Sequence, residues 1–410
     1  MLAQSGQMTT TQRTAIRRGL AVRRTSHGPP RRGRQPGHGS IVAPLAASVV
    51  LGVAAAGVLR LGLAVAIAER DRRAARARRR HDRQFALLPG EQPAQGMRRM
   101  VLGQLDLAID LLEAEDGAMP TAEAVHETRK ALKRLRTLVR LLADQLGEEA
   151  AAREQALLRD AGRRLAGARD AEVIVGTLEE LLRRHPRKLA RPGVIRLRRR
   201  LLAEREQATT RLLGDHVARA HVLADLRDAR ARMAMWAPTA DTGIAPLEPP
   251  FKRIYRQGRG RYLRASQGKG DRTAALHRWR KRVKDLRYAA EALSRNDPAA
   301  ARRADAATAP NRARKRSGRR KRELIPGLAR RADALGEMLG EEHDLFVLDQ
   351  RVRAGGDCGP GTRRALLKLI DRRRERLRTR ALRDGARLYG RRPKKLLGRL
   401  RRAYAREARM

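Results

Sequence analysis

Apolar residues recur at helical spacing through most of the chain after residue 85. At about 100° per residue, one stripe of the clearest stretch holds Leu276, Trp279, Val283, Leu286, Ala290 and Leu293. Ala, Leu, Arg and Glu dominate the composition and runs of β-branched residues are scarce, so the pattern predicts an all-α protein. The expected helices cover 96–113, the stretch after Thr121, 148–184, 194–233, 251–265, 273–294, 323–339, 343–353, 362–389 and a final basic segment from Pro393.

A cluster of prolines divides these helices into two groups. Pro238, Pro246, Pro249 and Pro250 cluster between two periodic regions, which predicts a Pro-rich linker over 236–250. The first half then covers 85–235 and the second half covers 251–410. Each half holds enough periodic sequence for a bundle of about four long helices.

A row of cationic residues runs beside the apolar stripe of the 273–294 helix. Its members are His277, Arg280, Lys281, Lys284, Arg287 and Tyr288. A purely solubilising face would lie opposite the apolar stripe, where we expect Arg278, Arg282 and Asp285 to point outward. The row therefore predicts a groove lined between helices.

The first half contains the same row. His126, Arg129, Lys130, Lys133 and Arg136 match His277, Arg280, Lys281, Lys284 and Arg287 position for position, and Arg140 follows on the same side. A second set of matches pairs Gly162, Leu165, Asp170 and Val173 with Gly336, Leu339, Asp344 and Val347. These matches predict an internal duplication in which the second copy carries a basic insert over 296–322. The segments 97–100 and 251–254 also resemble each other, more weakly, in their order of apolar and basic residues. This similarity adds Arg99, Arg253 and Arg256 as secondary binding candidates.

The N-terminal region, residues 1–84, differs from the rest. It is a basic leader without period, which predicts disorder, and it contains an apolar segment over 41–68. Three interpretations of that segment stay open: a single membrane anchor, a soluble appendage or over-extended start, and an export signal. Arginines lie on both sides of it, so the positive-inside rule cannot orient it.

The charge balance calls for an anionic partner. The chain has 94 Lys and Arg against 44 Asp and Glu, a formal net charge of +50. Aromatic residues make up only 2%, too few for the stacking platforms of single-strand nucleic-acid binders, so phosphate is a better match than bases. The single cysteine, Cys358, allows no internal disulfide and favours a reducing, cytoplasmic compartment.

The two cation rows also carry a family resemblance. With Arg169-Asp170 and His343-Asp344 as secondary marks, residues 85 to about 405 resemble the CHAD family, the conserved histidine α-helical domain. The match is weaker in the first half, where Thr137 stands against Tyr288 and Arg140 against Glu291. The resemblance implies two related four-helix bundles facing each other across a basic cavity, and binding of inorganic polyphosphate. The triphosphate-tunnel enzyme domain that accompanies many members has no signature here.

Several alternatives accompany this interpretation. The basic rows could be solvated faces with salt bridges, and His126 and His277 could serve only as backbone hydrogen-bonding groups. No cluster of residues predicts a metal site, a cofactor or catalysis, and Asp170, His343 and Asp344 fit structural roles. The leading hypothesis is a non-catalytic polyphosphate-binding module that could recruit the protein to polyphosphate granules. The alternative is a nucleic-acid-associated basic protein, and the sequence predicts no oligomeric state.

Overall fold

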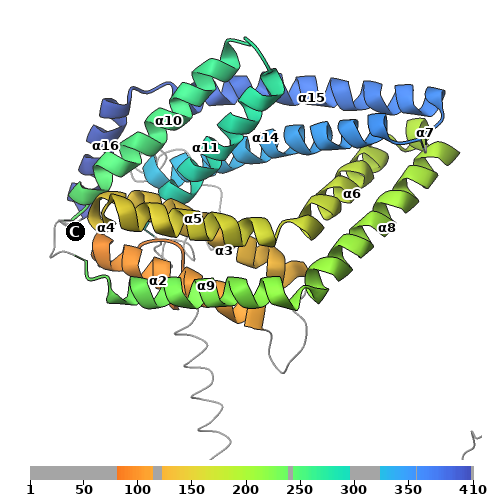
Figure 1. Ribbon diagram of the computed structural model, residues 1–410. Helices are drawn as coiled ribbons and strands as arrows, with labels where there is room; N and C mark the ends of the chain where they lie inside the picture. The colour runs from red at the N-terminus through yellow and green to blue at the C-terminus, as the bar shows by residue number, and fades with distance from the viewer. Residues whose placement is uncertain (1–80, 114–121, 239–242, 296–323, 357, 408–410) are drawn as a thin grey trace, which may run out of the picture. The chain divides into compact units, whose positions relative to one another are not determined.

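The computed structural model describes residues 81–113, 122–238, 243–295, 324–356 and 358–407 (Figure 1). The chain divides into two units, Met1–Arg70 and Asp71–Met410, and every described residue belongs to the second. The predicted basic leader, the apolar segment 41–68 and the insert 296–322 lie outside the described residues.

The first half is built from six long helices and two single turns. In chain order these are α2 (Pro93–Glu113), α3 (Ala122–Leu141), α4 (Ala143–Leu146), α5 (Glu148–Arg164), α6 (Gly167–Arg184), α7 (Pro186–Leu189), α8 (Pro192–Gly214) and α9 (His216–Met235). The break between α8 and α9 has a local cause. The side chain of Asp215 accepts a hydrogen bond from the Ala218 amide (2.9 Å) and caps α9.

The second half contains longer, continuous helices. Its elements are η2 (Ala245–Leu247), α10 (Glu248–Ser266), α11 (Arg272–Ala292), α14 (Leu324–Ala354), α15 (Pro360–Tyr389) and α16 (Pro393–Glu407). Across the described residues the only β pairing is an isolated bridge between Leu87 and Arg295. The all-α prediction is confirmed.

Several predicted boundaries were wrong. The expected break between 339 and 343 does not occur, because α14 runs unbroken past His343, while the expected single helices 148–184 and 194–233 are each split in two. The Pro-rich linker is also shorter than predicted. Pro249 and Pro250 lie in the first turn of α10, where proline lacks only an amide hydrogen that this turn leaves unbonded anyway.

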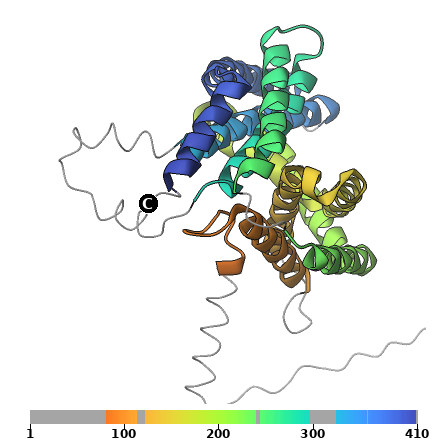
Figure 2. The same ribbon diagram turned by 90° about the vertical axis from the view of Figure 1, so that its left-hand side faces the viewer.

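The helices differ in length between the two halves. In the first half α5 is followed by α6, and α8 by α9, as separate helices, whereas α14 and α15 of the second half are each continuous (Figure 1). The halves pack together where α3 meets α11 and where α6 meets α14. Figure 2 shows the second half stacked on the first along this junction. One apolar core crosses it and includes Leu135 of α3 and Leu286 of α11.

Among the helices of the described residues, none combines the length and apolar character that a membrane span requires.

Candidate functional site

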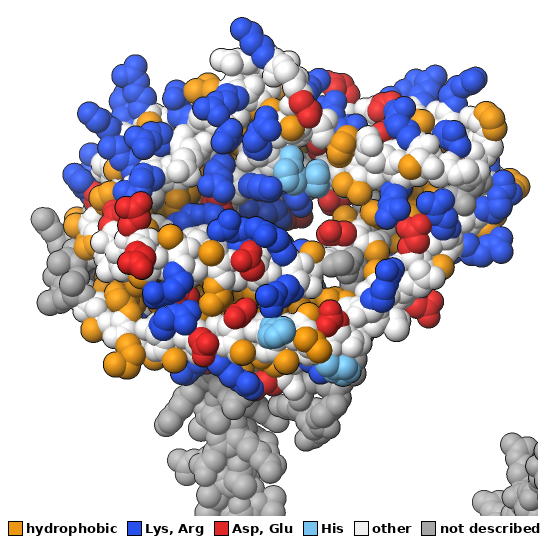
Figure 3. All heavy atoms as spheres, in the orientation of Figure 1, with side chains coloured by type: hydrophobic (Ala, Val, Ile, Leu, Met, Phe, Trp, Pro, Cys, Tyr) orange, Lys and Arg blue, Asp and Glu red, His pale blue; other side chains and the backbone are white. Residues whose placement is uncertain are grey.

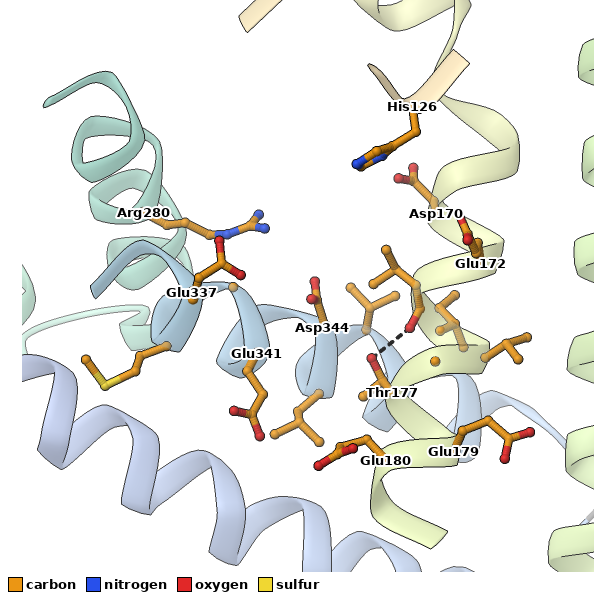
Figure 4. A pocket seen from close by; sticks show the side chains of 18 of the residues that line it. His126, Asp170, Glu172, Thr177, Glu179, Glu180, Arg280, Glu337, Glu341 and Asp344 are labelled. Carbon is orange, nitrogen blue, oxygen red and sulfur yellow. Dashed lines mark hydrogen bonds between the residues drawn. The ribbon is translucent and has the colours of Figure 1, made fainter. Parts of the chain in front are cut away.

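A cavity of about 1300 Å³ opens where the two halves meet. Its walls come from α3, α6 and α8 of the first half and from α11 and α14 of the second. Lys and Arg side chains gather in this hollow on the face shown in Figure 3. Figure 4 shows α6 and α14 facing each other across it, with Arg280 pointing in from α11 and His126 from α3.

Both cation rows reach this cavity. Three Lys or Arg residues from each copy line it: Arg129, Lys130 and Lys133 on α3, and Arg280, Lys284 and Arg287 on α11. His126 and Tyr288 line it as well, and Tyr288 is only 6% exposed. Members of both predicted rows therefore line one cavity between the halves.

Close helix packing sets the positions of the two arginines. Nη1 of Arg129 donates a hydrogen bond to the Gly162 carbonyl of α5 (2.8 Å). In the second half, a Cβ built on Gly340 would lie 3.4 Å from Nη2 of Arg280, so the bare backbone of α14 leaves room for the guanidinium. Gly336 lies similarly close to the Lys284 side chain. Glycines on the facing helix thus let the cations lie flat against it.

The cations of α11 are partly neutralised by neighbouring carboxylates. Nζ of Lys284 lies 3.6 Å from Oε1 of Glu337, and Arg287 pairs with Glu291 (2.9 Å) and Asp333. Burial lowers the pKa of Lys284, and Glu337 opposes that shift. These two residues are less available to a ligand than Arg280, which has no carboxylate partner among the described residues.

The cavity is not uniformly basic. Nine Lys or Arg residues line it together with seven carboxylates: Asp170, Glu172, Glu179, Glu180, Glu337, Glu341 and Asp344. At the end formed by α6, α8 and α14 the carboxylates have local partners. Glu179 pairs with Arg198 (2.6 Å), Glu180 with Arg184, and Glu341 with Arg373 (2.7 Å). These ion pairs offset part of the positive charge at that end of the cavity.

Two predicted binding residues, Arg136 and Arg140, lie at the junction between the halves and not in the cavity. Arg140 of α3 forms an ion pair with Asp285 of α11 (2.5 Å), and neither lines the cavity. Arg136 lies nearby with its Nε buried, and burial together with the Arg140 charge lowers its pKa. The outward position expected for Asp285 was wrong, because its side chain is only 14% exposed and also contacts Arg282 (3.0 Å).

Lys281 and Arg256 lie on a different surface. Both line a separate groove between α10 and α11, together with Arg278 and Arg282. The expectation that Lys281 belongs to the cavity row is not met. Its counterpart Lys130 lines the cavity, whereas Lys281 lies at the edge of its row and lines the groove with α10. Arg278 is exposed, as expected, and its side chain lines the edge of this groove.

The remaining secondary candidates have structural partners. Arg99 donates to Glu91 (2.7 Å) and to the carbonyls of Gln84 (2.8 Å) and Ala86 (2.7 Å), which fastens the segment before α2. Arg253 of α10 pairs with Asp144 of α4 (2.5 Å) across the two halves. Neither lines the cavity.

His277 packs against His343 of α14 instead of lining the cavity. The ring centroids are 4.2 Å apart, and Nδ1 of both rings is buried without a hydrogen-bond partner in the described structure. Burial and the surrounding cations lower the pKa of both side chains to about 4. Both rings are therefore neutral at physiological pH.

Comparison with protein-family models identifies the family of the chain. The family model of the CHAD domain matches residues 103–310, which include all of α3 and α11. The chain belongs to the CHAD family. A similar solved structure is the crystal structure of the CHAD domain from the plant Ricinus communis, with a TM-score of 0.46 and 20% sequence identity over 75% of this chain and 95% of that chain. No curated protein matches the chain.

The CHAD cavity also contains residues that the sequence pattern did not predict. Arg184 of α6 and Arg198 and Arg205 of α8 line it, as do five glutamates: Glu172, Glu179, Glu180, Glu337 and Glu341. These residues have no counterpart in the duplicated rows, and α6 and α8 reach the cavity only through tertiary packing. Periodicity along one helix could not have identified them.

Proposed function

We propose that this CHAD domain binds inorganic polyphosphate in the cavity between its halves and leaves the polymer intact. The observation that carries the proposal is the convergence of two matching cation rows on one cavity, with Arg129 and Lys133 on one side and Arg280 on the other. A solvated face would not place both rows opposite each other. Polyphosphate has a charge on every unit, so it matches cations supplied from both walls.

The lining chemistry favours phosphate over bases. Tyr288 is the single aromatic among the described residues that line the cavity, and its buried ring offers no open face for stacking. Arginine can bind two phosphate oxygens at once, whereas lysine provides a point charge that follows a flexible chain. The cavity has both types at its α3 and α11 end.

Three carboxylates of the cavity support a binding role without turnover. Glu179, Glu180 and Glu341 each have an arginine partner, and a carboxylate held this way is less available as a metal ligand or base. Among the described residues, no group of three or more His, Cys, Asp or Glu side chains could hold a metal ion.

We place the protein in the cytoplasm, recruited to polyphosphate granules.

The alternative function is nonspecific nucleic-acid binding, which rests on the net charge of +50. A competition experiment distinguishes polyphosphate binding from nonspecific nucleic-acid binding. Labelled polyphosphate bound at physiological salt should resist displacement by duplex DNA at equal charge concentration, and Mg²⁺ should release no orthophosphate from it. Efficient displacement by DNA would favour the alternative, and specific release of orthophosphate by the purified protein would overturn the non-catalytic role.

A further inference from the structure

The groove between α10 and α11 is a second cationic surface of the same half. Its volume is about 560 Å³, and its walls are two antiparallel helices joined by a short turn that contains Gly268 and Gly270. Each helix contributes three cations: Arg256, Arg261 and Arg264 from α10, and Arg278, Lys281 and Arg282 from α11. Their spacing along each helix places them on one face.

The charges of this groove are less compensated than those of the cavity. None of the described residues that line the groove is acidic, whereas seven carboxylates line the cavity. Arg282 donates to Gln257 (3.2 Å) and pairs with Asp285 (3.0 Å). The other five cations form no hydrogen bond or ion pair with any described residue. The five cations without a partner create a positive potential that a bound anion would relieve.

One helix therefore presents cations to two binding surfaces. Arg280 and Lys284 of α11 face the cavity, while Arg278, Lys281 and Arg282 face the groove. Residues 280 and 281 are neighbours in sequence, so the two surfaces approach each other around α11. A flexible polyanion that occupies one surface can reach the other.

We propose that the α10–α11 groove is a second binding site for a polyphosphate segment, and that long chains occupy the cavity and the groove together. This proposal rests on the polyphosphate-binding function proposed above. The groove contains no aromatic residue among its described lining, so bases have no stacking platform there and phosphate is the favoured ligand. Simultaneous occupancy makes the second contact intramolecular, so long chains should bind more tightly than short ones.

The experiment compares two triple variants of the full chain. The groove variant carries Arg256→Gln, Arg264→Gln and Arg278→Gln, all exposed residues, so the fold should be retained. The matched control carries Arg364→Gln, Lys368→Gln and Arg372→Gln on α15, which are also exposed and line neither the cavity nor the groove. Both lose three charges. Calorimetry with tripolyphosphate measures the number of sites, and titration with long-chain polyphosphate measures affinity.

The expected result is two tripolyphosphate sites in the wild type and control, and one in the groove variant. Long-chain affinity should fall at least about tenfold in the groove variant relative to the control, because the avidity of the second site is removed. Equal long-chain affinity of the groove and control variants would overturn the groove site, even if the wild type binds tightly. Loss of duplex DNA binding alone in the groove variant would also overturn it, in favour of a nucleic-acid surface. If the wild type binds neither tripolyphosphate nor long-chain polyphosphate, the proposed function itself is refuted.

Discussion

Nη1 of Arg140 in α3 lies 2.5 Å from Oδ1 of Asp285 in α11, so an ion pair joins the two halves through the helices that carry the cation rows. Oδ2 of the same carboxylate lies 3.0 Å from Arg282. Arg136 is close enough that the charges of Arg140 and Asp285 both affect its pKa. One carboxylate thus stabilises a cluster of arginines at the junction.

Replacing that carboxylate should therefore destabilise the protein. Asp285→Asn removes two charge-assisted interactions and leaves three arginines close together without a counter-charge. We expect the free energy of unfolding to fall by about 1–3 kcal/mol, measured by urea denaturation.

A second ion pair between the halves provides the control. Asp144 pairs with Arg253 at a similar distance, but both side chains are more than 40% exposed. Because water screens that pair, Asp144→Asn should cost only about 0–1 kcal/mol. Equal losses of stability in the two variants would contradict a special role for the Asp285 cluster.

Cavity variants should alter the salt dependence of polyphosphate binding. Arg129→Gln and Arg280→Gln remove matching cations from the two rows, and each should weaken binding by about 1–3 kcal/mol. Each should also flatten the slope of log affinity against log salt by about one unit for each phosphate that the variant no longer neutralises. Titrations over a range of salt concentrations measure both quantities.

The matched control for these variants is Arg364→Gln on α15, an exposed arginine outside the cavity and the groove. It removes the same charge from a different surface. If it lowers the affinity and the salt slope as much as the cavity variants do, binding follows total charge and the cavity has no particular role.

Two helical glycines mark tight packing in the second half. A Cβ on Gly385 of α15 would lie 2.6 Å from the Trp279 ring, and a Cβ on Gly258 of α10 would lie 2.9 Å from the Tyr389 ring. Alanine favours helices, but overpacking against these rings should cost about 1–3 kcal/mol in thermal or urea unfolding of Gly385→Ala and Gly258→Ala. Gly398 of α16 has no atom within 4 Å of its Cβ position, so Gly398→Ala should stabilise by up to about 1 kcal/mol. A stabilised Gly385→Ala would contradict this packing.

The sequence predicted the all-α class because helical periodicity determines it, and it placed Arg129 and Arg280 at matching positions of two cation rows. That the two rows face one cavity was expected only from the family resemblance. The sequence could not predict where Lys281 and Asp285 lie. Each sits near the edge of a stripe, and the neighbouring helix decides which surface it joins. The acidic wall of α6 and α14 was missed for a similar reason, since a carboxylate such as Glu179 enters the cavity only when distant helices pack.

The paired rings of His277 and His343 predict a pH dependence of stability. Burial is the main cause that lowers both pKa values from the ordinary 6.5 to about 4. The charges facing the pair add to this: Arg278, Arg280 and Lys281 from α11, and Arg374 from α15. The uncharged ring of Phe346 also lies near His343, with the ring centroids 6.3 Å apart.

Between pH 6.5 and about 4, the unfolded chain binds protons at these histidines that the folded chain does not. The free energy of unfolding should therefore be fully retained above pH 6.5 and should decline as the pH falls toward 4. Urea unfolding of the wild type and of His343→Gln, at neutral pH and again midway through that window, measures the effect. The variant should lose less stability on acidification, because carboxylates titrate equally in both proteins and only one histidine differs. His221→Gln, at an exposed position on α9, is the matched control and should behave as the wild type does. An acid-induced loss of stability in His343→Gln as large as in the wild type would show that the buried pair does not couple protonation to unfolding.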